Sequence, residues 1–535
     1  MTEKIMKKIA ILFSVLLPLF GISCTDLLME ESKTSITSNW LVTTPDGLDR
    51  MVVGLYERDR KILTDNDAEL FCALQMDYCT DILLFNNGTA ADLGRLSGLN
   101  ASTRHFGRMW SHYYQIIGKA NEIITAAEGM DMNDAVVKKA WGEAKVFRAR
   151  SYFELYKRFE RLYLNTVPTT VDNVDRVFKP SGKEAVFALI EKDLSDADVL
   201  GWTDQPGRFT KAVAKHLRAQ VAMWEDDWTT AIDACEDIFG CPDYGMMDNA
   251  IDCFTGADLN KKENLYVYQF SANLGGGGSV TGGEFRGHRI SLITTSRYQS
   301  VTGMDFSSEY GGYGWGRVFP NTYLLGLYDQ AHDKRYTNMF RFKWYYNNPD
   351  KLPSGKNLGD EVVPKTADEY IQNLHPMSLK YFDGWTRSDM LEAAWGFKDV
   401  VVYRLAETYL MAAEAYYHRD GGASPKAVEY YNKTWERAGN EHFDGPLTID
   451  ILLDEYAREL HLEGVRWPLL KRLGMLERVK LHGGDTPAED PMLKERTDLA
   501  QQRANFDPKH YLWPIPQSEI DFMGVKNFPQ NDGWL

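Results

Sequence analysis

The sequence predicts a mainly α-helical protein in which antiparallel helix pairs form a scaffold for a long irregular segment with few short strands. Two regions, about residues 107–239 and 399–475, place apolar residues at the i, i+3 and i+7 spacing of helices. Between them, about residues 241–398 are rich in glycine and aromatic side chains and show no sustained period. Because a long irregular segment within a compact protein is usually functional, we expect the ligand-binding residues mostly there.

The first helical region divides into segments with clear apolar faces. Glu143–Phe159 forms one continuous apolar face, and Lys183–Leu200 repeats the pattern after a Ser-Gly break. Thr210–Trp224 and Thr229–Phe239 follow as a close pair with a short break between them. We expect this pair to pack as antiparallel helices.

The second helical region repeats this organisation. Val400–Tyr417 is followed by Lys426–Arg437, and Ser424 and Pro425 supply an N-cap and a first-turn proline for the second helix. Thr448 caps the next helix. Short helix pairs with small residues at their contacts resemble tetratricopeptide repeats, although no strict period of about 34 residues holds. A generic helical bundle is the alternative.

The N-terminus predicts export and lipid anchoring. Lysines precede the apolar run Ile9–Ile22. At about 1.5 Å per residue this run is too short to span a hydrocarbon core of about 30 Å. It ends in small residues that lead into Cys24, the arrangement of a bacterial lipoprotein signal. Lipidated Cys24 would anchor the mature chain to a membrane without threading it through. An ordinary secretory signal with an incidental cysteine is the alternative.

Composition and charge exclude several classes of function. The chain has 535 residues, 44% of them hydrophobic, so it can bury a large core and is not disordered. Its 60 basic and 76 acidic residues give a net charge of −16, with no lysine-arginine cluster. Nucleic-acid binding needs a basic footprint, so we expect no nucleic-acid partner. The 14 Trp, 28 Tyr and 25 Phe favour a ligand site only where they fall in loops.

No cofactor or metal motif stands out. The cysteines after Cys24 show neither C-x-x-C nor zinc spacing with histidine, and they are Cys72, Cys79, Cys235, Cys241 and Cys253. We expect buried thiols, while a disulfide among the last three stays open. The glycine-rich loop Gly275–Arg289 lacks the strand-to-helix setting of a phosphate cradle, so an ordinary mobile loop is expected. No calcium-binding loop motif occurs, and whether scattered carboxylates hold an ion is left open.

Motifs spread over nearly the whole chain occur in the order of one known family. They are Asp26–Leu28 with Thr44–Tyr56, Trp110–Ile124, Glu143–Leu155 with Val167 and Pro168, Arg404–Ala415, Glu455–Trp467, and Trp513–Trp534. Together they resemble the SusD/RagB family of Bacteroidetes outer-membrane lipoproteins. The chain departs from the family at Tyr456, where many members have arginine. It also has Pro468–Leu470 where the family often has an aspartate after the arginine-aromatic pair. Both departures touch a structural motif.

The resemblance implies a SusD-like fold and a function without catalysis. It implies a surface-exposed lipoprotein of the outer membrane that captures oligosaccharide and delivers it to a SusC-like TonB-dependent transporter. The expected organisation is a signal peptide over 1–23 and a single unit over 24–535, with scaffold at about 40–240 and 399–475, ligand-binding region at about 241–398 and tail at about 476–535. Some members handle peptides or glycoproteins, so a helical-repeat protein with such a ligand is one alternative.

Two loops offer the side chains that a sugar needs, flat aromatic rings for its C–H faces and polar groups for its hydroxyls. The first, Tyr78–Arg95, has Asp81, Phe85, Asn86 and Asn87. The second, Ser307–Phe319, has Tyr310, Tyr313, Trp315 and Arg317. Glycines flank almost every ring of the second loop, so these rings belong to no regular helical face; they either cover the protein locally or face solvent. Phe85 fits the core equally well. Reserve candidates are Trp344, Tyr345, Tyr346 and Trp385.

Regularly spaced acids in the second helical region raise the alternative of a glycoside hydrolase. Glu455 and Arg458 lie at i, i+3, and Glu455 and Glu459 share a helix face, with Arg466 shortly after. A hydrolase would need two carboxylates about 5–10 Å apart beside the aromatic site, and no motif pairs acids with these loops. We therefore expect an ion-pair network that fixes the last helix, and no catalytic residues. Glu407 and Glu414 are interpreted in the same way.

Overall fold

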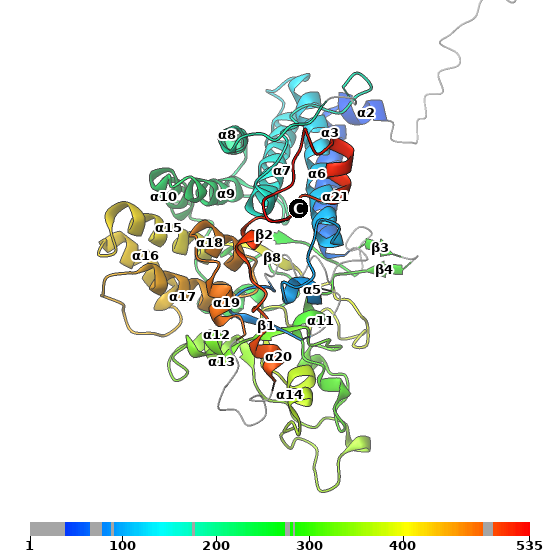
Figure 1. Cartoon of the computed structure of the whole chain (residues 1–535), viewed down its shortest axis with the longest axis vertical. Helices are drawn as coiled ribbons and strands as arrows, with labels where there is room; N and C mark the ends of the chain where they lie inside the picture. Colours follow the sequence, from blue (N-terminus) through cyan, green and yellow to red (C-terminus); the bar gives the residue numbers. More distant parts are fainter. Residues whose placement is uncertain are drawn as a thin grey trace, which may run out of the picture.

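The computed structural model describes residues 38–64, 78–86, 90–173, 177–272, 279–281, 284–484 and 496–534 (Figure 1). The expected signal peptide, the lipidation site Cys24, Cys72 and the candidate Asn87 lie outside these residues.

A layer of long helices forms the upper part of the molecule in Figure 1. Its members are α2 (Ser38–Thr43), α3 (Pro45–Arg60), α6 (Arg104–Glu128), α7 (Ala135–Phe159) and the C-terminal α21 (Gln517–Met523). Helix α7 begins because the Asp134 carboxylate accepts hydrogen bonds from the amides of Val136 and Val137 at 2.8 and 3.2 Å. It contains the predicted Glu143–Phe159 face and ends at Glu160, which has a positive φ of 54°.

The predicted helix pairs lie beside this layer (Figure 1). They are α8 (Lys183–Asp196), α9 (Lys211–Trp224), α10 (Trp228–Phe239), α15 (Leu405–Asp420), α16 (Pro425–Trp435) and α17 (Ile449–Leu460). Small side chains let α9, α10 and α15 approach closely, and Ala219, Ala231 and Ala412 are completely buried in their shared cluster. The structure confirms the caps at Ser424 and Thr448, which accept from the amides three residues on.

The prediction for Val400–Tyr417 was wrong at its start. Residues Val400–Arg404 form strand β8, which pairs antiparallel with β2 (Asn264–Tyr268), and the helix begins only at Leu405. Three consecutive valines at 400–402 explain the difference, because β-branched side chains favour a pleated strand. The partner strand lies in the irregular segment, where the apolar period of the helix offers no signal.

The described residues of the irregular segment, and those of the loop 78–95, form only short elements, as predicted for the irregular segment. Strand β1 (Leu83–Phe85) pairs with β5 (Val318–Pro320), β3 (Ser279–Thr281) with β4 (Glu284–Arg286), and β6 (Phe340–Arg341) with β7 (Met377–Ser378), all antiparallel. The short helices are α5 (Ala91–Gly94), α11 (Ile290–Thr294), α12 (Thr322–Gly326), α13 (Lys334–Asn338) and α14 (Ala367–Asn373). The C-terminal region adds α18 (Arg466–Arg472), α19 (Arg478–His482) and α20 (Thr497–Ala500).

A buried ion-pair network joins the second helical region to the irregular segment. Glu459 on α17 accepts from Arg404 at 2.7 Å, from Arg335 at 2.9 Å and from Arg437. Glu455 binds Arg335 at 2.7 Å and Arg458 at 2.8 Å. Apart from Arg437, which is partly buried, these residues are buried, and the network expected from the i, i+3 spacing is confirmed. Glu407 and Glu414 have internal partners too, in His216 and Arg472 respectively.

The three cysteines between residues 235 and 253 behave as small apolar side chains. Cys235, Cys241 and Cys253 are buried free thiols, so the alternative of a disulfide among them is wrong. Burial raises the pKa of the Cys235 and Cys253 thiols above the ordinary range, which keeps them protonated and unreactive.

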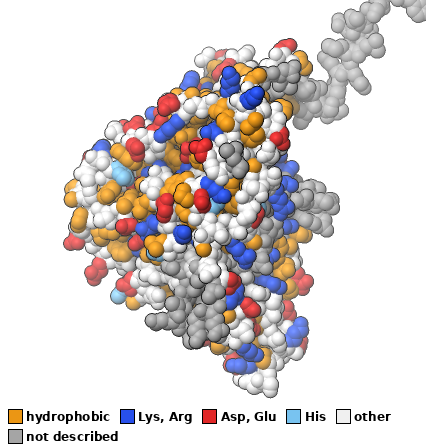
Figure 2. All heavy atoms as spheres, viewed as in Figure 1, with side chains coloured by type: hydrophobic (Ala, Val, Ile, Leu, Met, Phe, Trp, Pro, Cys, Tyr) orange, Lys and Arg blue, Asp and Glu red, His pale blue; other side chains and the backbone are white. Residues whose placement is uncertain are grey.

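Figure 2 shows acidic and basic side chains interspersed over the visible face of the molecule.

Candidate functional site

The loop Ser307–Phe319 is held in place from beneath by one buried arginine. Arg387 is completely buried, and its guanidinium donates to the carbonyl oxygens of Gly311 at 2.9 Å, Tyr313 at 3.1 Å and Leu391 at 3.3 Å, and also to that of Ala393. Burial lowers the pKa of Arg387 to about 10, so it is still charged at neutral pH. Four carbonyl groups are thus satisfied by a single side chain.

The rest of the loop is fastened through its backbone to α11 and the residues around it. The amide of Trp315 donates to the carbonyl of Leu292 at 2.8 Å, and that of Arg317 donates to Ile293 at 2.9 Å. Glycine is required at 314, because a Cβ there would lie 2.0 Å from the carbonyl oxygen of Ser296. Gly316 has a φ of 58°, a left-handed conformation that other residues adopt only with strain. The glycines therefore let the loop backbone pack closely against the protein, while the Tyr313 and Trp315 rings stay partly exposed.

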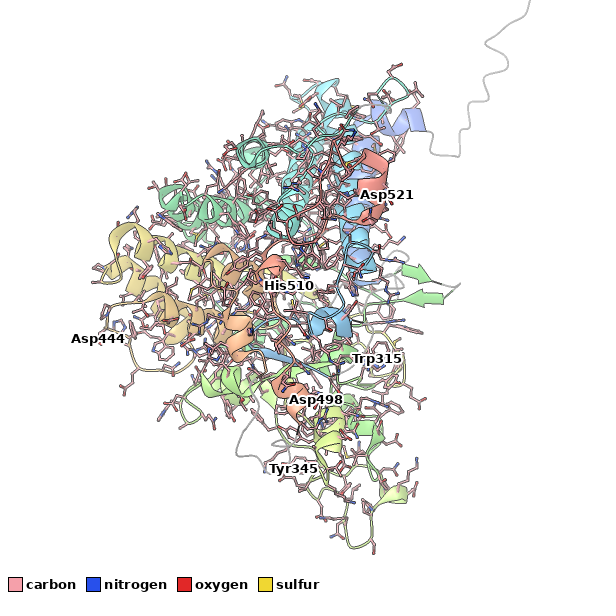
Figure 3. All side chains as sticks on the ribbon, viewed as in Figure 1. Trp315, Tyr345, Asp444, Asp498, His510 and Asp521 are labelled. Carbon is pink, nitrogen blue, oxygen red and sulfur yellow. The ribbon has the colours of Figure 1, made fainter. Side chains whose placement is uncertain are left out.

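Tyr313 and Trp315 are the partly exposed rings of this loop. Their centres are 6.4 Å apart and their planes meet at 88°. Phe306 adds a further perpendicular ring, 5.7 Å from Tyr313 at 86°. The guanidinium of Arg317 lies 5.5 Å from the centre of the Trp315 ring, and Figure 3 places Trp315 in the lower half of the molecule, built largely from the irregular segment. These partly exposed rings offer C–H-binding faces in two orientations.

The structure brings Asn86 of the first loop to the second loop. Its amide donates to the carbonyl of Arg317 at 2.8 Å, and its side chain donates to Gly316 at 3.2 Å. Asn86 is only partly buried, and its polar side chain lies at Gly316, the residue after Trp315. The pairing of β1 with β5 places it there.

The other candidates of the first loop are structural. Asp81 is completely buried and forms an ion pair with Arg466 at 2.6 Å. Burial alone would raise the pKa of Asp81, but the Arg466 guanidinium outweighs burial and lowers it below the ordinary value. Phe85 is completely buried too, with its ring 5.6 Å from Tyr78 in the core. Neither side chain has a surface to offer a ligand, and Phe85 fills the core as the alternative expected.

Tyr310 also belongs to the interior. It is 1% exposed, and its hydroxyl donates to the carbonyl of Tyr345 at 3.2 Å. We therefore remove Asp81, Phe85 and Tyr310 from the candidate site, which retains Tyr313, Trp315, Arg317 and Asn86. Among the reserve candidates, Trp344 and Tyr346 are buried, while Tyr345 and Trp385 are 39% and 41% exposed.

Sequence reasoning missed Arg387 and Arg289. Arg387 follows the loop by about 70 residues in a stretch without period, and only the folded chain brings it beneath Gly311. Arg289 ends the glycine-rich loop that the sequence marked only as mobile, and its guanidinium lies 5.4 Å from the centre of the Trp315 ring. No spacing in the sequence links either residue to the rings.

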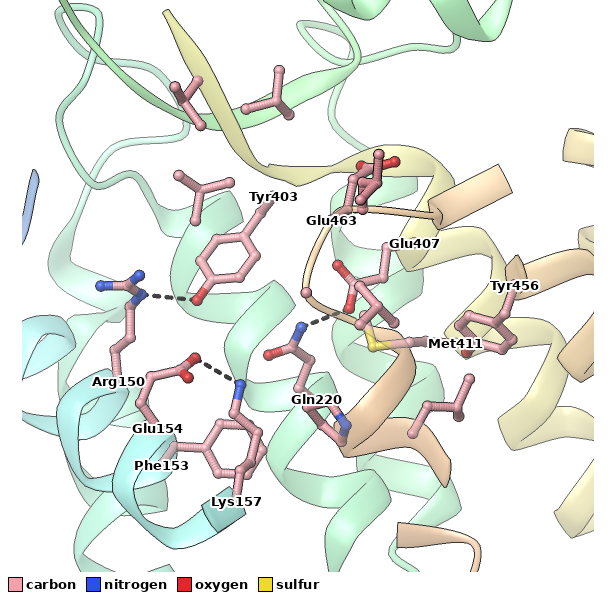
Figure 4. A pocket seen from close by; sticks show the side chains of 18 of the residues that line it. Arg150, Phe153, Glu154, Lys157, Gln220, Tyr403, Glu407, Met411, Tyr456 and Glu463 are labelled. Atoms are coloured by element: carbon pink, nitrogen blue, oxygen red, sulfur yellow. Dashed lines mark hydrogen bonds and ion pairs between the residues drawn. The ribbon is translucent and has the colours of Figure 1, made fainter. Parts of the chain in front are cut away.

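A separate cavity of about 110 Å³ lies between α7, α9, β8 and α15 (Figure 4). Charged groups point into it, but they have partners within the protein: Glu154 binds Lys157 at 2.6 Å, and Gln220 donates to Glu407 at 2.7 Å. Burial acts to raise the pKa of Glu154, yet Lys157 and Arg158 lower it to about 2. Because these charges satisfy one another, we interpret the cavity as part of the scaffold.

The described part of the chain contains no cluster of His, Cys, Asp and Glu side chains that could hold a metal ion. None of its helices is long and apolar enough to cross a membrane.

Comparison with known proteins shows a likeness to one family. Residues 283–534 match the model of the SusD family. Over 579 aligned positions, the chain is 26% identical to SusD-like protein P2 of Formosa agariphila, covering 99% of this chain and 100% of that protein. The chain is therefore similar to members of the SusD family over nearly its whole length. SusD-like protein P25 of the same organism is 24% identical, over 78% of this chain and 79% of its own.

Solved structures of the SusD superfamily share the fold. A SusD homologue from Bacteroides thetaiotaomicron superposes with a TM-score of 0.73 at 17% identity, covering 93% of this chain and 99% of that one. Surface glycan-binding protein A from the same organism, in complex with laminarihexaose, has a TM-score of 0.69 at 19% identity, covering 91% and 100%. The predicted mainly helical, SusD-like fold is confirmed.

Proposed function

We propose that this SusD-like chain is a glycan-binding protein of the cell surface. It binds an oligosaccharide at the site formed by Tyr313, Trp315, Arg317 and Asn86 and delivers it to a SusC-like TonB-dependent transporter. The match to the SusD family model supports this, together with the structural neighbour that is in complex with laminarihexaose. Lipidated Cys24 would hold the mature chain, residues 24–535, at the outer membrane as a single unit.

The observation that carries the proposal is the rigid presentation of two perpendicular, partly exposed rings. Aromatic rings bind the C–H faces of sugars, and affinity benefits when the rings are ordered before the ligand arrives. Arg387 and the amides of Trp315 and Arg317 provide that order. Asn86 and Arg317 supply the polar groups that hydroxyls require.

We propose that the chain acts without catalysis. The regularly spaced acids that suggested a hydrolase, Glu455 and Glu459, are buried and bonded to arginines. They therefore lack the access to substrate that general acid catalysis requires. A reducing-end assay with the polysaccharide that the protein binds tests this, and release of sugar above the level of a heat-denatured control would contradict it.

A glycan array followed by titration tests the binding function. We expect the double variant Tyr313→Ala, Trp315→Ala to bind the strongest array ligand at least about 30-fold more weakly, since each anchoring ring contributes about 1–2 kcal/mol. Tyr345→Ala is the matched control, because this exposed ring lies outside the loop and the residue bonds to Tyr310 through its backbone. Binding of a peptide array in place of every glycan would favour the peptide-binding alternative.

Anchoring and transport need separate experiments. We expect the wild-type protein to fractionate with the outer membrane and Cys24→Ala to be released. We also expect a TonB-dependent transporter to co-purify with the tagged protein from detergent-solubilised outer membranes. Release of both forms alike would contradict the proposed anchor, and purification without a transporter would contradict the proposed delivery.

A further inference from the structure

Three arginine side chains lie around the exposed rings of the candidate loop. The guanidinium carbons of Arg289 and Arg317 are 5.4 and 5.5 Å from the centre of the Trp315 ring, within the range of a cation–π contact. A third guanidinium, that of Arg95, lies 3.4 Å from the carbonyl oxygen of Asn86. Asn86 itself is bonded to the backbone of Arg317. The site therefore carries a concentration of positive charge.

Within the described residues, neither Arg289 nor Arg95 has a carboxylate partner. Some other arginines that solvent reaches do have one: Arg208 binds Glu143 and Asp49, and Arg496 binds Asp368 and Asp498. The chain has 76 acidic residues against 60 basic ones, so partners are plentiful overall. Uncompensated guanidinium groups in a protein of net charge −16 create a local positive potential that attracts an anion.

The contact with Trp315 orients the Arg289 guanidinium without using its hydrogen bonds. A guanidinium against an indole ring keeps its N–H groups free at the edge, where they match the paired oxygens of a carboxylate or sulfate. Arg289 is partly exposed and directly precedes α11, whose residue Leu292 anchors the loop at Trp315. The cation is therefore fixed relative to both rings.

We propose that the ligand of this site is an anionic oligosaccharide whose carboxylate or sulfate group binds Arg289, with Arg95 adding positive charge. Trp315 then also holds the Arg289 guanidinium in place, and both rings offer C–H contacts to the sugar. This inference rests on the proposed glycan-binding function and names the class of glycan. A uronic acid residue and a sulfate ester present the same chemistry to Arg289.

The test is affinity electrophoresis in gels that contain defined polysaccharides. The anionic probes are polygalacturonate, alginate and carrageenan, and the neutral probes are laminarin, starch and xylan. We expect retardation by at least one anionic probe and its loss when carboxyl groups are reduced or sulfate esters removed. Loss on carboxyl reduction identifies a uronate, and loss on desulfation identifies a sulfate. Retardation should weaken in high salt, because screening reduces partly exposed charge interactions.

Variants assign the effect to the site. For oligosaccharides of the retarding anionic probe, we expect Arg289→Ala to raise the dissociation constant at least about tenfold and Arg289→Lys to recover part of the affinity. Arg341→Ala is the control, because this arginine donates to the carbonyl of Glu309 and contacts the buried Tyr310. Circular dichroism melting confirms that each variant is folded.

The outcomes separate this inference from the proposed function. Retardation by neutral polysaccharides alone, or an unchanged dissociation constant for Arg289→Ala, would overturn the anionic ligand and leave glycan binding in place. Retardation by none of the six polysaccharides would overturn both.

Discussion

Replacing Arg387 by methionine should loosen the loop Ser307–Phe319 without changing Tyr313 or Trp315. The guanidinium makes four hydrogen bonds to backbone carbonyl groups, which at about 1.5 kcal/mol each amount to about 6 kcal/mol. Burying the charge offsets part of this. The pKa falls from about 12.5 to about 10, which corresponds to about 3.5 kcal/mol at about 1.4 kcal/mol per pH unit. The net loss of stabilisation in the loop and the residues bonded beneath it is therefore about 2.5 kcal/mol.

Hydrogen–deuterium exchange measures this loss without any ligand. The amides of Tyr313, Trp315 and Arg317 are bonded to carbonyl groups at 2.7–2.9 Å, so they should exchange slowly in the wild-type protein. In Arg387→Met a loss of about 2.5 kcal/mol predicts about 70-fold faster exchange. The control Arg341→Met removes one carbonyl bond from the same region and should leave these amides within about threefold. Equal exchange in wild-type protein and Arg387→Met would refute the role given to Arg387.

Three further predictions concern the scaffold and the loop. Glu459→Gln should lower the free energy of unfolding in urea by about 3–5 kcal/mol, because it removes a carboxylate that Arg335, Arg404 and Arg437 share and leaves the buried network one negative charge short. The exposed Glu429→Gln should cost under about 1 kcal/mol, and similar losses for the two variants would contradict the network. The pKa of Glu154 is lowered to about 2 in the folded state, so its contribution to stability should be complete above about pH 4.5 and be lost as the pH falls toward 2. In Glu154→Gln the midpoint of urea unfolding should therefore depend less on pH over that range. A pH profile identical to that of the wild type would contradict this. Gly314→Ala should weaken glycan binding at least about tenfold, since its Cβ would lie 2.0 Å from the carbonyl oxygen of Ser296. The control Gly326→Ala should bind normally, because there is open space around that residue. Equal affinities of the two variants would show that the loop tolerates displacement.

The helical scaffold was largely predictable because its signals are local. The apolar face of Glu143–Phe159 and the caps at Ser424 and Thr448 depend on residues within a few positions of one another. The ion pair between Glu455 and Arg458 was predictable for the same reason. Strand β8 was missed because its partner β2 lies more than 100 residues earlier, in a segment without period.

The site was predictable only in part. Glycines around Tyr313 and Trp315 marked rings outside any regular helix, and the structure places these two rings at the surface. The same signal applied to Tyr310, but the burial of that ring depends on its contacts with Tyr298 and Tyr345, which no local pattern reveals. Asp81 suggested a hydroxyl-binding acid in a loop, yet its partner Arg466 is 385 residues away. Long-range partners decided which polar side chains were available.

A binding titration tests the central claim most directly. A purified oligosaccharide, the strongest ligand of the glycan array, is titrated into the wild-type protein and into the Tyr313→Ala, Trp315→Ala variant. The structure predicts saturable binding by the wild type and at least about 30-fold weaker binding by the variant, with Tyr345→Ala unchanged. Equal affinity of the wild type and the double variant would contradict a ligand site on this loop.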